Sequence, residues 1–140
     1  MENTALLGTW KMISWTREVV ATGEIADAMG ANPVGYIAYH ADGRMMATVF
    51  RRDRGKPMAS APTDKEKIGL FDTMLAYCAA YTLEDGKVIH HVEGAWNPIW
   101  EMDLVRPFML DGDELLISDA PGIDPRTGEA VIFRLRFRKV

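Results

Sequence analysis

The sequence predicts a mainly β protein: a closed, eight-stranded antiparallel barrel with one α-helix, over about residues 63–80, that covers one end. Three Asp-Gly pairs are the first observation behind this prediction, since each lies between apolar segments and supplies the positive φ angles of a tight hairpin turn. The second observation is the alternation of apolar and polar residues in the first and last segments of the chain. The third is a single segment that carries the start signal and the apolar spacing of a helix.

Hairpin turns at Asp42-Gly43, Asp85-Gly86 and Asp111-Gly112 connect most of the predicted strands. Long strands over residues 8–19 and 130–138 begin and end the sheet. The strands expected between them are residues 34–40, 44–51, 81–83, 87–93, 101–110 and 114–118. A sheet of eight antiparallel strands removes its exposed edges when it closes on itself, so a barrel is favoured over a sandwich. At this size the interior holds either side chains or one small ligand.

The last predicted strand alternates without interruption, which is typical of a sheet with one buried face. One face carries Val131, Phe133, Leu135 and Phe137, and the other carries Ile132, Arg134, Arg136 and Arg138. The arginines are therefore expected on the outside. In the first strand Trp10 and Met12 form the apolar face, opposite Lys11 and Arg17. Trp15 falls on the polar face and breaks the pattern, so we expect a loop to cover it.

The predicted helix begins with Thr63-Asp64-Lys65-Glu66, the S/T-x-x-E pattern of a capping box. Ile68, Phe71, Leu75 and Cys78 follow at spacings of three and four residues, which indicates a wide apolar face. We expect this face to cover one end of the barrel.

Composition narrows the class of protein. A chain of 140 residues is one domain, residues 1–140, and 16 basic against 20 acidic side chains give a net charge of −4, which argues against nucleic-acid binding. The single cysteine, Cys78, allows neither an intrachain disulfide nor a thiol-rich zinc site. No metal and no cofactor are expected, because three histidines cannot converge readily and no phosphate-binding glycine loop is present. Without an apolar run of signal-peptide or membrane-spanning length, we expect a cytoplasmic protein with no membrane partner, either monomeric or a homodimer.

Two polar residues share a strand face with apolar neighbours and are the candidates for chemistry. Arg106 lies on the face of Leu104 and Phe108, and His90 lies on the face of Val88, so we expect both inside the barrel. A buried arginine needs an acceptor, which is either a structural carboxylate or carbonyl, or an oxygen of a ligand. Stacking of the cation on Trp10 is a further structural reading. His90 is either a hydrogen-bonded core residue or a general acid or base.

The remaining candidate ligand-binding residues are mostly aromatic. Tyr36 and Tyr39 lie on opposite faces of one strand, so one of them faces the interior, and the pattern leaves open which. Trp96, Asn97 and Trp100 lie around the connection between the strands 87–93 and 101–110, where aromatic walls with an amide suit the mouth of a pocket. A rim packed on itself is the alternative. The full set of predicted ligand-binding residues is Trp10, Tyr36, Tyr39, Trp96, Asn97, Trp100 and Phe108.

Several segments spread over nearly the whole chain form a recognisable set. They are Gly8-Thr9-Trp10-Lys11, residues 33–39 followed by Asp42-Gly43-Arg44-Met45, His90-His91-Val92-Glu93-Gly94, Asn97-Pro98 and Arg106. Together they resemble the bacterial and fungal lipocalin-like domain family. The resemblance implies a calycin-type barrel with an internal small-molecule site.

Three functions fit these observations. The first is binding of a small, largely apolar, oxygen-bearing metabolite in the lumen, with Arg106 and His90 as polar anchors. The alternative is a cofactor-free isomerase, cyclase or dehydratase, in which His90 moves a proton and Arg106 stabilises negative charge on oxygen. The third is a module that binds a partner through Arg134 and Arg136 on the outer face.

Overall fold

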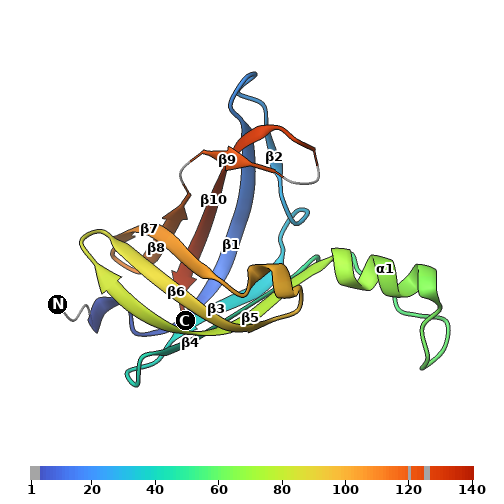
Figure 1. Cartoon of the computed structure of the whole chain (residues 1–140), viewed down its shortest axis with the longest axis horizontal. Coiled ribbons are helices and arrows are strands. Elements are labelled where there is room, and N and C mark those ends of the chain that lie inside the picture. Colours follow the sequence, from blue (N-terminus) through green and yellow to red (C-terminus); the bar gives the residue numbers. More distant parts are fainter. Residues whose placement is uncertain (1–3, 120, 125–126) are drawn as a thin grey trace.

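The chain closes into a barrel because its first long strand pairs with its last. In the computed structural model, which describes residues 4–119, 121–124 and 127–140, strands β1 (Gly8–Val19) and β10 (Ala130–Lys139) are antiparallel neighbours. The described residues form a closed eight-stranded antiparallel barrel with one α-helix (Figure 1), which confirms the predicted fold class.

Around the barrel the strand order is β1-β3-β4-β5-β6-β7-β8-β10, and β10 returns to β1. The strands between the first and the last are β3 (Val34–Tyr39), β4 (Arg44–Phe50), β5 (Met74–Glu84), β6 (Lys87–Ala95), β7 (Asp103–Asp111) and β8 (Glu114–Ser118). The short strands β2 (Ile25–Asp27) and β9 (Gly122–Ile123) were not predicted. They pair with the end of β1 and with the start of β10. The three Asp-Gly pairs connect β3 to β4, β5 to β6 and β7 to β8, and each glycine has a positive φ.

A bulge in β1 explains why the sequence pattern breaks at Trp15. The pairing of β1 with β10 shifts between Met12 and Ser14, and an extra residue at this point reverses which side chains face inward. Trp15 therefore shares the inner face with Trp10 and Met12, and all three are buried. Arg17 follows Trp15 onto the inner face, which corrects the expectation that it points to solvent. No covering loop is needed to explain the burial of Trp15.

The helix begins where predicted and ends earlier. Thr63 and Glu66 form the expected capping box at the start of α1 (Asp64–Asp72). Residues 74–80 belong to strand β5, so the prediction of a helix to about residue 80 was wrong. Leu75 and Tyr77 also alternate with exposed or half-buried neighbours, and hydrogen bonds to β4 and β6 on both sides stabilise the strand. Pairing in the sheet thus decides between two apolar periods that the sequence contains.

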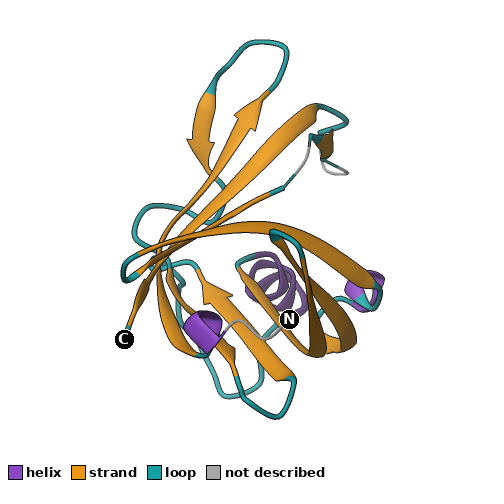
Figure 2. Cartoon of the chain, turned by 90° about the vertical axis from the view of Figure 1, so that its left-hand side faces the viewer, coloured by secondary structure: helices purple, strands orange, loops and turns teal. Residues whose placement is uncertain are grey.

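The predicted position of the helix also needs correction. None of the residues of α1, all of which the structure describes, is buried, and the helix projects away from the barrel instead of lying across its end (Figure 1). Leu6 of the 3₁₀ helix η1 (Thr4–Leu6) is fully buried and belongs to the core of the barrel, whose strands are orange in Figure 2. The Leu6 carbonyl accepts a hydrogen bond from the Trp10 indole at 2.9 Å. Lys139, and not an arginine, lies over the Trp10 ring at 4.6 Å.

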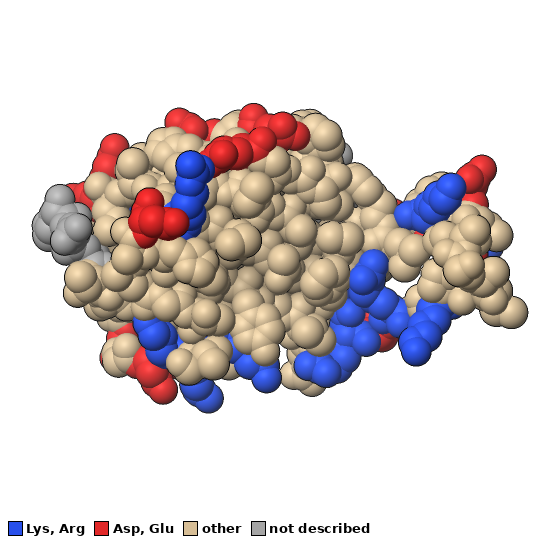
Figure 3. All heavy atoms as spheres, turned by 90° about the horizontal axis from the view of Figure 1, so that it is seen from below, with Lys and Arg blue, Asp and Glu red and all other residues tan. Residues whose placement is uncertain are grey.

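Charged side chains are distributed unevenly over the face of the molecule in Figure 3. Seen from below, Lys and Arg gather towards the projecting end (Figure 3). Before α1, Arg51 donates to the Asp53 carboxylate and Arg52 donates to the Asn32 carbonyl, both at the surface. Within the described residues, no helix is both long enough and apolar enough to cross a membrane.

The densely packed part of the interior makes a prediction about stability. Leu115 on β8 is 1% exposed, and Leu115→Ala is expected to lower the free energy of unfolding by about 2–5 kcal/mol, because a cavity replaces its methyl groups. Met109 on β7 is 69% exposed, and Met109→Ala is expected to change the free energy of unfolding by about 0.5 kcal/mol or less. Urea unfolding of both variants measures the difference. Equal losses would contradict the packing described here.

Candidate functional site

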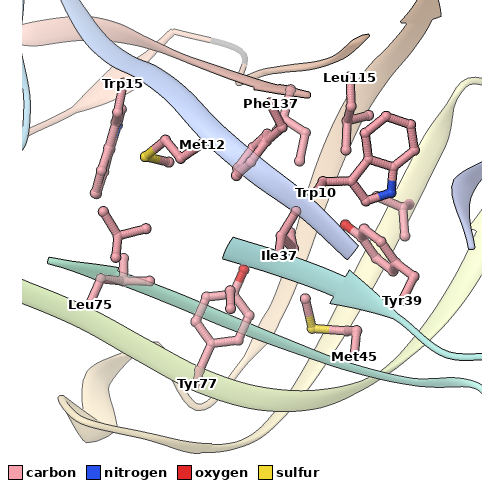
Figure 4. Packing of buried hydrophobic residues seen from close by; sticks show 14 of the residues in the cluster. Trp10, Met12, Trp15, Ile37, Tyr39, Met45, Leu75, Tyr77, Leu115 and Phe137 are labelled. Carbon is pink, nitrogen blue, oxygen red and sulfur yellow. The ribbon is translucent and has the colours of Figure 1, made fainter. Parts of the chain in front are cut away.

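The barrel interior is divided between a packed part and a cavity. Trp10, Tyr39 and Leu115 pack together at one side of the core, and Trp15 lies at the other side (Figure 4). The cavity has a volume of about 450 Å³ and is bordered by Trp15 but not by Trp10, Tyr39 or Leu115. Its wall is mainly apolar and comes from most strands of the barrel, with contributions from the end of α1 and from the connection between β6 and β7.

A histidine lies between two tyrosines at the boundary between cavity and packed core. His90 is 1% exposed, its Nε2 is 2.7 Å from the Tyr39 hydroxyl, and its Nδ1 is 2.8 Å from the Tyr77 hydroxyl. A neutral imidazole has one donor and one acceptor nitrogen, so one tyrosine donates to the ring and the other accepts from it. His90 and Tyr77 border the cavity, whereas Tyr39 holds the ring from the side of the packed core. Both nitrogens of the ring are therefore occupied by the protein itself.

Burial determines the ionisation of this triad. Loss of solvent lowers the pKa of His90 to about 3, and the nearby charges of Arg106 and His91 act in the same direction. Burial raises the pKa of Tyr77 to about 12, although Arg106 opposes this shift. Burial also raises the pKa of Tyr39 well above its usual value. All three side chains are uncharged at neutral pH.

Arg106 has a carboxylate partner inside the barrel. Its Nη1 donates to Oδ1 of Asp119 at 2.7 Å, and the two side chains are 17% and 21% exposed. Both residues border the cavity. Asp119 is thus the structural carboxylate partner, one of the two explanations that the sequence allows for a buried Arg106. We call His90, Tyr77, Arg106 and Asp119 the polar cluster.

His91 faces the opposite way from His90. Its Nδ1 lies 2.9 Å from the Asp103 carboxylate and its Nε2 lies 2.8 Å from the Thr82 hydroxyl, both on the outer wall. Among the described residues, no three His, Cys, Asp or Glu side chains lie close enough together to hold a metal ion.

The predicted mouth residues lie together at the cavity. Trp96, Asn97 and Trp100 all border it, on the turn that contains the 3₁₀ helix η2 (Pro98–Trp100). Asn97 caps this helix, because its side-chain oxygen accepts from the Ile99 amide at 3.2 Å. The Trp96 indole donates to the Phe71 carbonyl at 3.3 Å, which ties the end of α1 to the mouth.

The other predicted ligand-binding residues divide differently. Tyr36 borders the cavity but is 42% exposed and lies on the face opposite to Tyr39. Tyr39 is the inward tyrosine, and it contacts His90. Trp10 lies in the core and Phe108 packs against it, and neither borders the cavity.

A second ion pair lies at another part of the cavity wall. Asp124 is 2% exposed and borders the cavity, and its Oδ2 accepts from Arg17 Nε at 3.0 Å. Trp15 also lines this region, and its ring meets Phe133 edge to face, with 6.0 Å between centroids. Within the described part of the chain, the Trp15 indole N–H is buried without a hydrogen-bond partner.

Sequence reasoning missed four residues of the site. Tyr77 was assigned to the helix, and only its alternation with Leu75 and Ala79 could have placed it in a strand. Asp119 and Asp124 follow β8 in the chain, where no pattern indicates orientation. Arg17 was placed outside because a one-residue bulge leaves no signal except the break at Trp15.

The fold and the cavity define a barrel built around a ligand-sized space. The family model described as "Lipocalin-like domain" matches residues 7–140, and the chain therefore belongs to the lipocalin-like domain family. Among solved structures, a lipocalin-like protein from Bacteroides uniformis ATCC 8492 is similar, with a TM-score of 0.53 and 12% identity over 96% of this chain and 98% of that chain. This likeness concerns the fold alone. No curated protein matches the chain significantly.

The low pKa of His90 predicts a pH dependence of stability. His90 stays neutral in the folded protein down to about pH 3, whereas the unfolded chain binds a proton at the ordinary pKa of 6.5. The unfolded state thus binds more protons below pH 6.5, so stability is lost as the pH falls from there. The slope from this one group is about 1.4 kcal/mol per pH unit between about pH 6 and 4.

Urea unfolding at several pH values measures this slope in the wild type, in His90→Gln and in the control His91→Gln on the outer wall. His90→Gln is expected to reduce the slope of the unfolding free energy against pH by the amount that corresponds to one bound proton. His91→Gln is expected to leave this contribution of His90 to the slope unchanged. Parallel curves for the wild type and His90→Gln would contradict the assignment of a neutral, buried His90.

Proposed function

We propose that this protein binds a small, largely apolar, oxygen-bearing molecule inside the barrel. The observation that carries the proposal is the cavity of about 450 Å³, which falls within the range of about 300–1,000 Å³ of ligand pockets. Most of its wall is apolar, and the polar cluster lies at one place in that wall. Such a distribution suits a ligand that is bound mainly by burial and oriented by a few polar contacts.

The unpaired indole N–H of Trp15 supports the presence of oxygen in the ligand. The N–H group is buried, and it belongs to a residue that borders the cavity. A buried donor without a hydrogen-bond partner destabilises the protein without ligand. Because the N–H itself is buried, a carbonyl, ether or hydroxyl oxygen of a ligand would satisfy it once neighbouring side chains move aside. The same oxygen chemistry suits the hydroxyl and guanidinium donors of the polar cluster.

Catalysis by His90 and Arg106 has less support than binding. A general acid or base works best when its pKa lies near the working pH, and the pKa of His90 is lowered to about 3. The ring nitrogens already contact Tyr39 and Tyr77, and Arg106 is engaged by Asp119. These groups are arranged to hold one another in place.

The outer arginines of β10 give no support to a partner-binding strip. Arg134 donates to Glu18 at 2.7 Å, and Arg136 and Arg138 both contact Glu114. These arginines therefore form ion pairs with the neighbouring strands β1 and β8 on the outside of the barrel.

Filling the cavity is expected to abolish binding. Ala47 on β4 is 6% exposed and borders the cavity, so Ala47→Phe places a ring in the space for the ligand. We expect this change to raise the dissociation constant of 2-acetylnaphthalene, a small aromatic ketone, by about tenfold or more. Isothermal titration calorimetry measures the effect.

The matched control is Ala38→Phe, at a position on β3 whose side chain is on the face opposite to Ile37 and Tyr39. Its affinity for the ketone is expected to stay within about twofold of the wild type, since surface substitutions have small effects. Equal affinities of Ala47→Phe and the wild type would overturn the lumen as the binding site.

A further inference from the structure

In the part of the chain that the structure describes, the buried charges that border the cavity are paired within the protein. Arg106 contacts Asp119 at 2.7 Å, and Asp124 contacts Arg17 at 3.0 Å. Of these four side chains none is more than 21% exposed, so solvent screens the pairs weakly. Among the described residues, the other ionisable groups of the wall are the neutral His90 and Tyr77, the phenol of Tyr36 and, at the exposed end of α1, Asp72.

A carboxylate ligand would meet two obstacles in this cavity. It could use Arg106 only by competing with Asp119, which already accepts from Nη1. It would also lie in a space bordered by the carboxylates of Asp119 and Asp124, in surroundings where an unpaired charge is costly. A cationic ligand is disfavoured as well, because Arg106 borders the same space.

The aromatic side chains of the wall come from opposite sides of the barrel. Tyr77 lies on β5 and stacks with Trp100, with 6.3 Å between centroids and 24° between planes. Phe133 lies on β10 with Trp15 beside it on β1. β5 and β10 are four strands apart in a ring of eight, so these two aromatic groups face each other across the lumen. Rings on two facing walls suit a flat ring between them.

We infer that the cavity selects an uncharged, flat aromatic compound, and that Asp119 excludes anions by holding the guanidinium of Arg106. This inference rests on the proposed function, since it specifies the ligand of the same cavity. It assigns Asp119 a role in specificity: the carboxylate leaves N–H groups of Arg106 to act as hydrogen-bond donors and cancels the charge that would attract an acid.

Two probes with the same ring system test the selectivity. 2-Acetylnaphthalene is uncharged and 2-naphthoate is an anion of similar size. By calorimetry at about pH 7.5, the wild type is expected to bind the ketone about tenfold or more tightly than the acid. This comparison does not depend on the folding of any variant.

Asp119→Asn tests the cause of the selectivity. The amide keeps the size of the side chain and removes its charge, so Arg106 becomes available to an anion. The ratio of the affinity for 2-naphthoate to the affinity for the ketone is expected to rise by about tenfold, because the removed charge acts on the anion and not on the neutral probe. Asp103→Asn is the matched control, because Asp103 makes its ion pair with His91 on the outer wall.

The outcomes separate this inference from the proposed function. Tight binding of the ketone with selectivity that Asp119→Asn abolishes and Asp103→Asn retains would support both. If the wild type binds both probes equally, or if Asp119→Asn leaves the selectivity unchanged, the inference is overturned while lumen binding stands. If the wild type binds neither probe, the proposed function fails and the inference fails with it.

Discussion

Pairing of the first strand with the last is the constraint on which the rest of this structure depends. Antiparallel hydrogen bonds between β1 and β10 close the sheet, and closure converts one face into an interior that solvent does not reach freely. The bulge near Met12 then determines which residues of β1 enter that interior. Beyond the bulge, Trp15 and Arg17 face inward, and both become part of the surroundings of the cavity. An uninterrupted strand would have placed them on the outer surface.

The interior that results combines a rigid part with a hollow part. Large side chains such as Trp10, Tyr39 and Leu115 fill one region, and the Tyr39 hydroxyl fixes His90 at its border. The hollow region retains polar groups, and its charges are balanced by partners in the protein. In a binding site, such paired charges favour an apolar ligand. Burial of the ligand's apolar surface stabilises the complex, and no unpaired charge in the cavity has to be neutralised by the ligand. In the proposed function, the ion pair between Arg106 and Asp119 that stabilises the buried arginine is also the source of selectivity by charge.

The fold was predictable because its signals are local. Asp-Gly turns and the alternation of β10 specify hairpins and faces, and the period of two in β6 and β7 placed His90 and Arg106 inside. Features that depend on contacts far along the chain were not predictable. Residues 74–80 carry both a helical and a strand period, and pairing with β4 and β6 decides between them. Asp119 and Asp124 become site residues through ion pairs with arginines on other strands, and no spacing in the sequence reveals such pairs.

The most direct test of the account is to locate a bound ligand by NMR. With methyl groups labelled, titration with 2-acetylnaphthalene should shift the signals of Ile37, Val49 and Leu75, which border the cavity, because the aromatic ring lies against them. The methyl signals of Val105 and Ile25, which are 50% and 60% exposed on the outside, should remain unchanged. Shifts confined to the outer residues, with the cavity signals constant at saturation, would contradict the claim that the lumen receives the ligand.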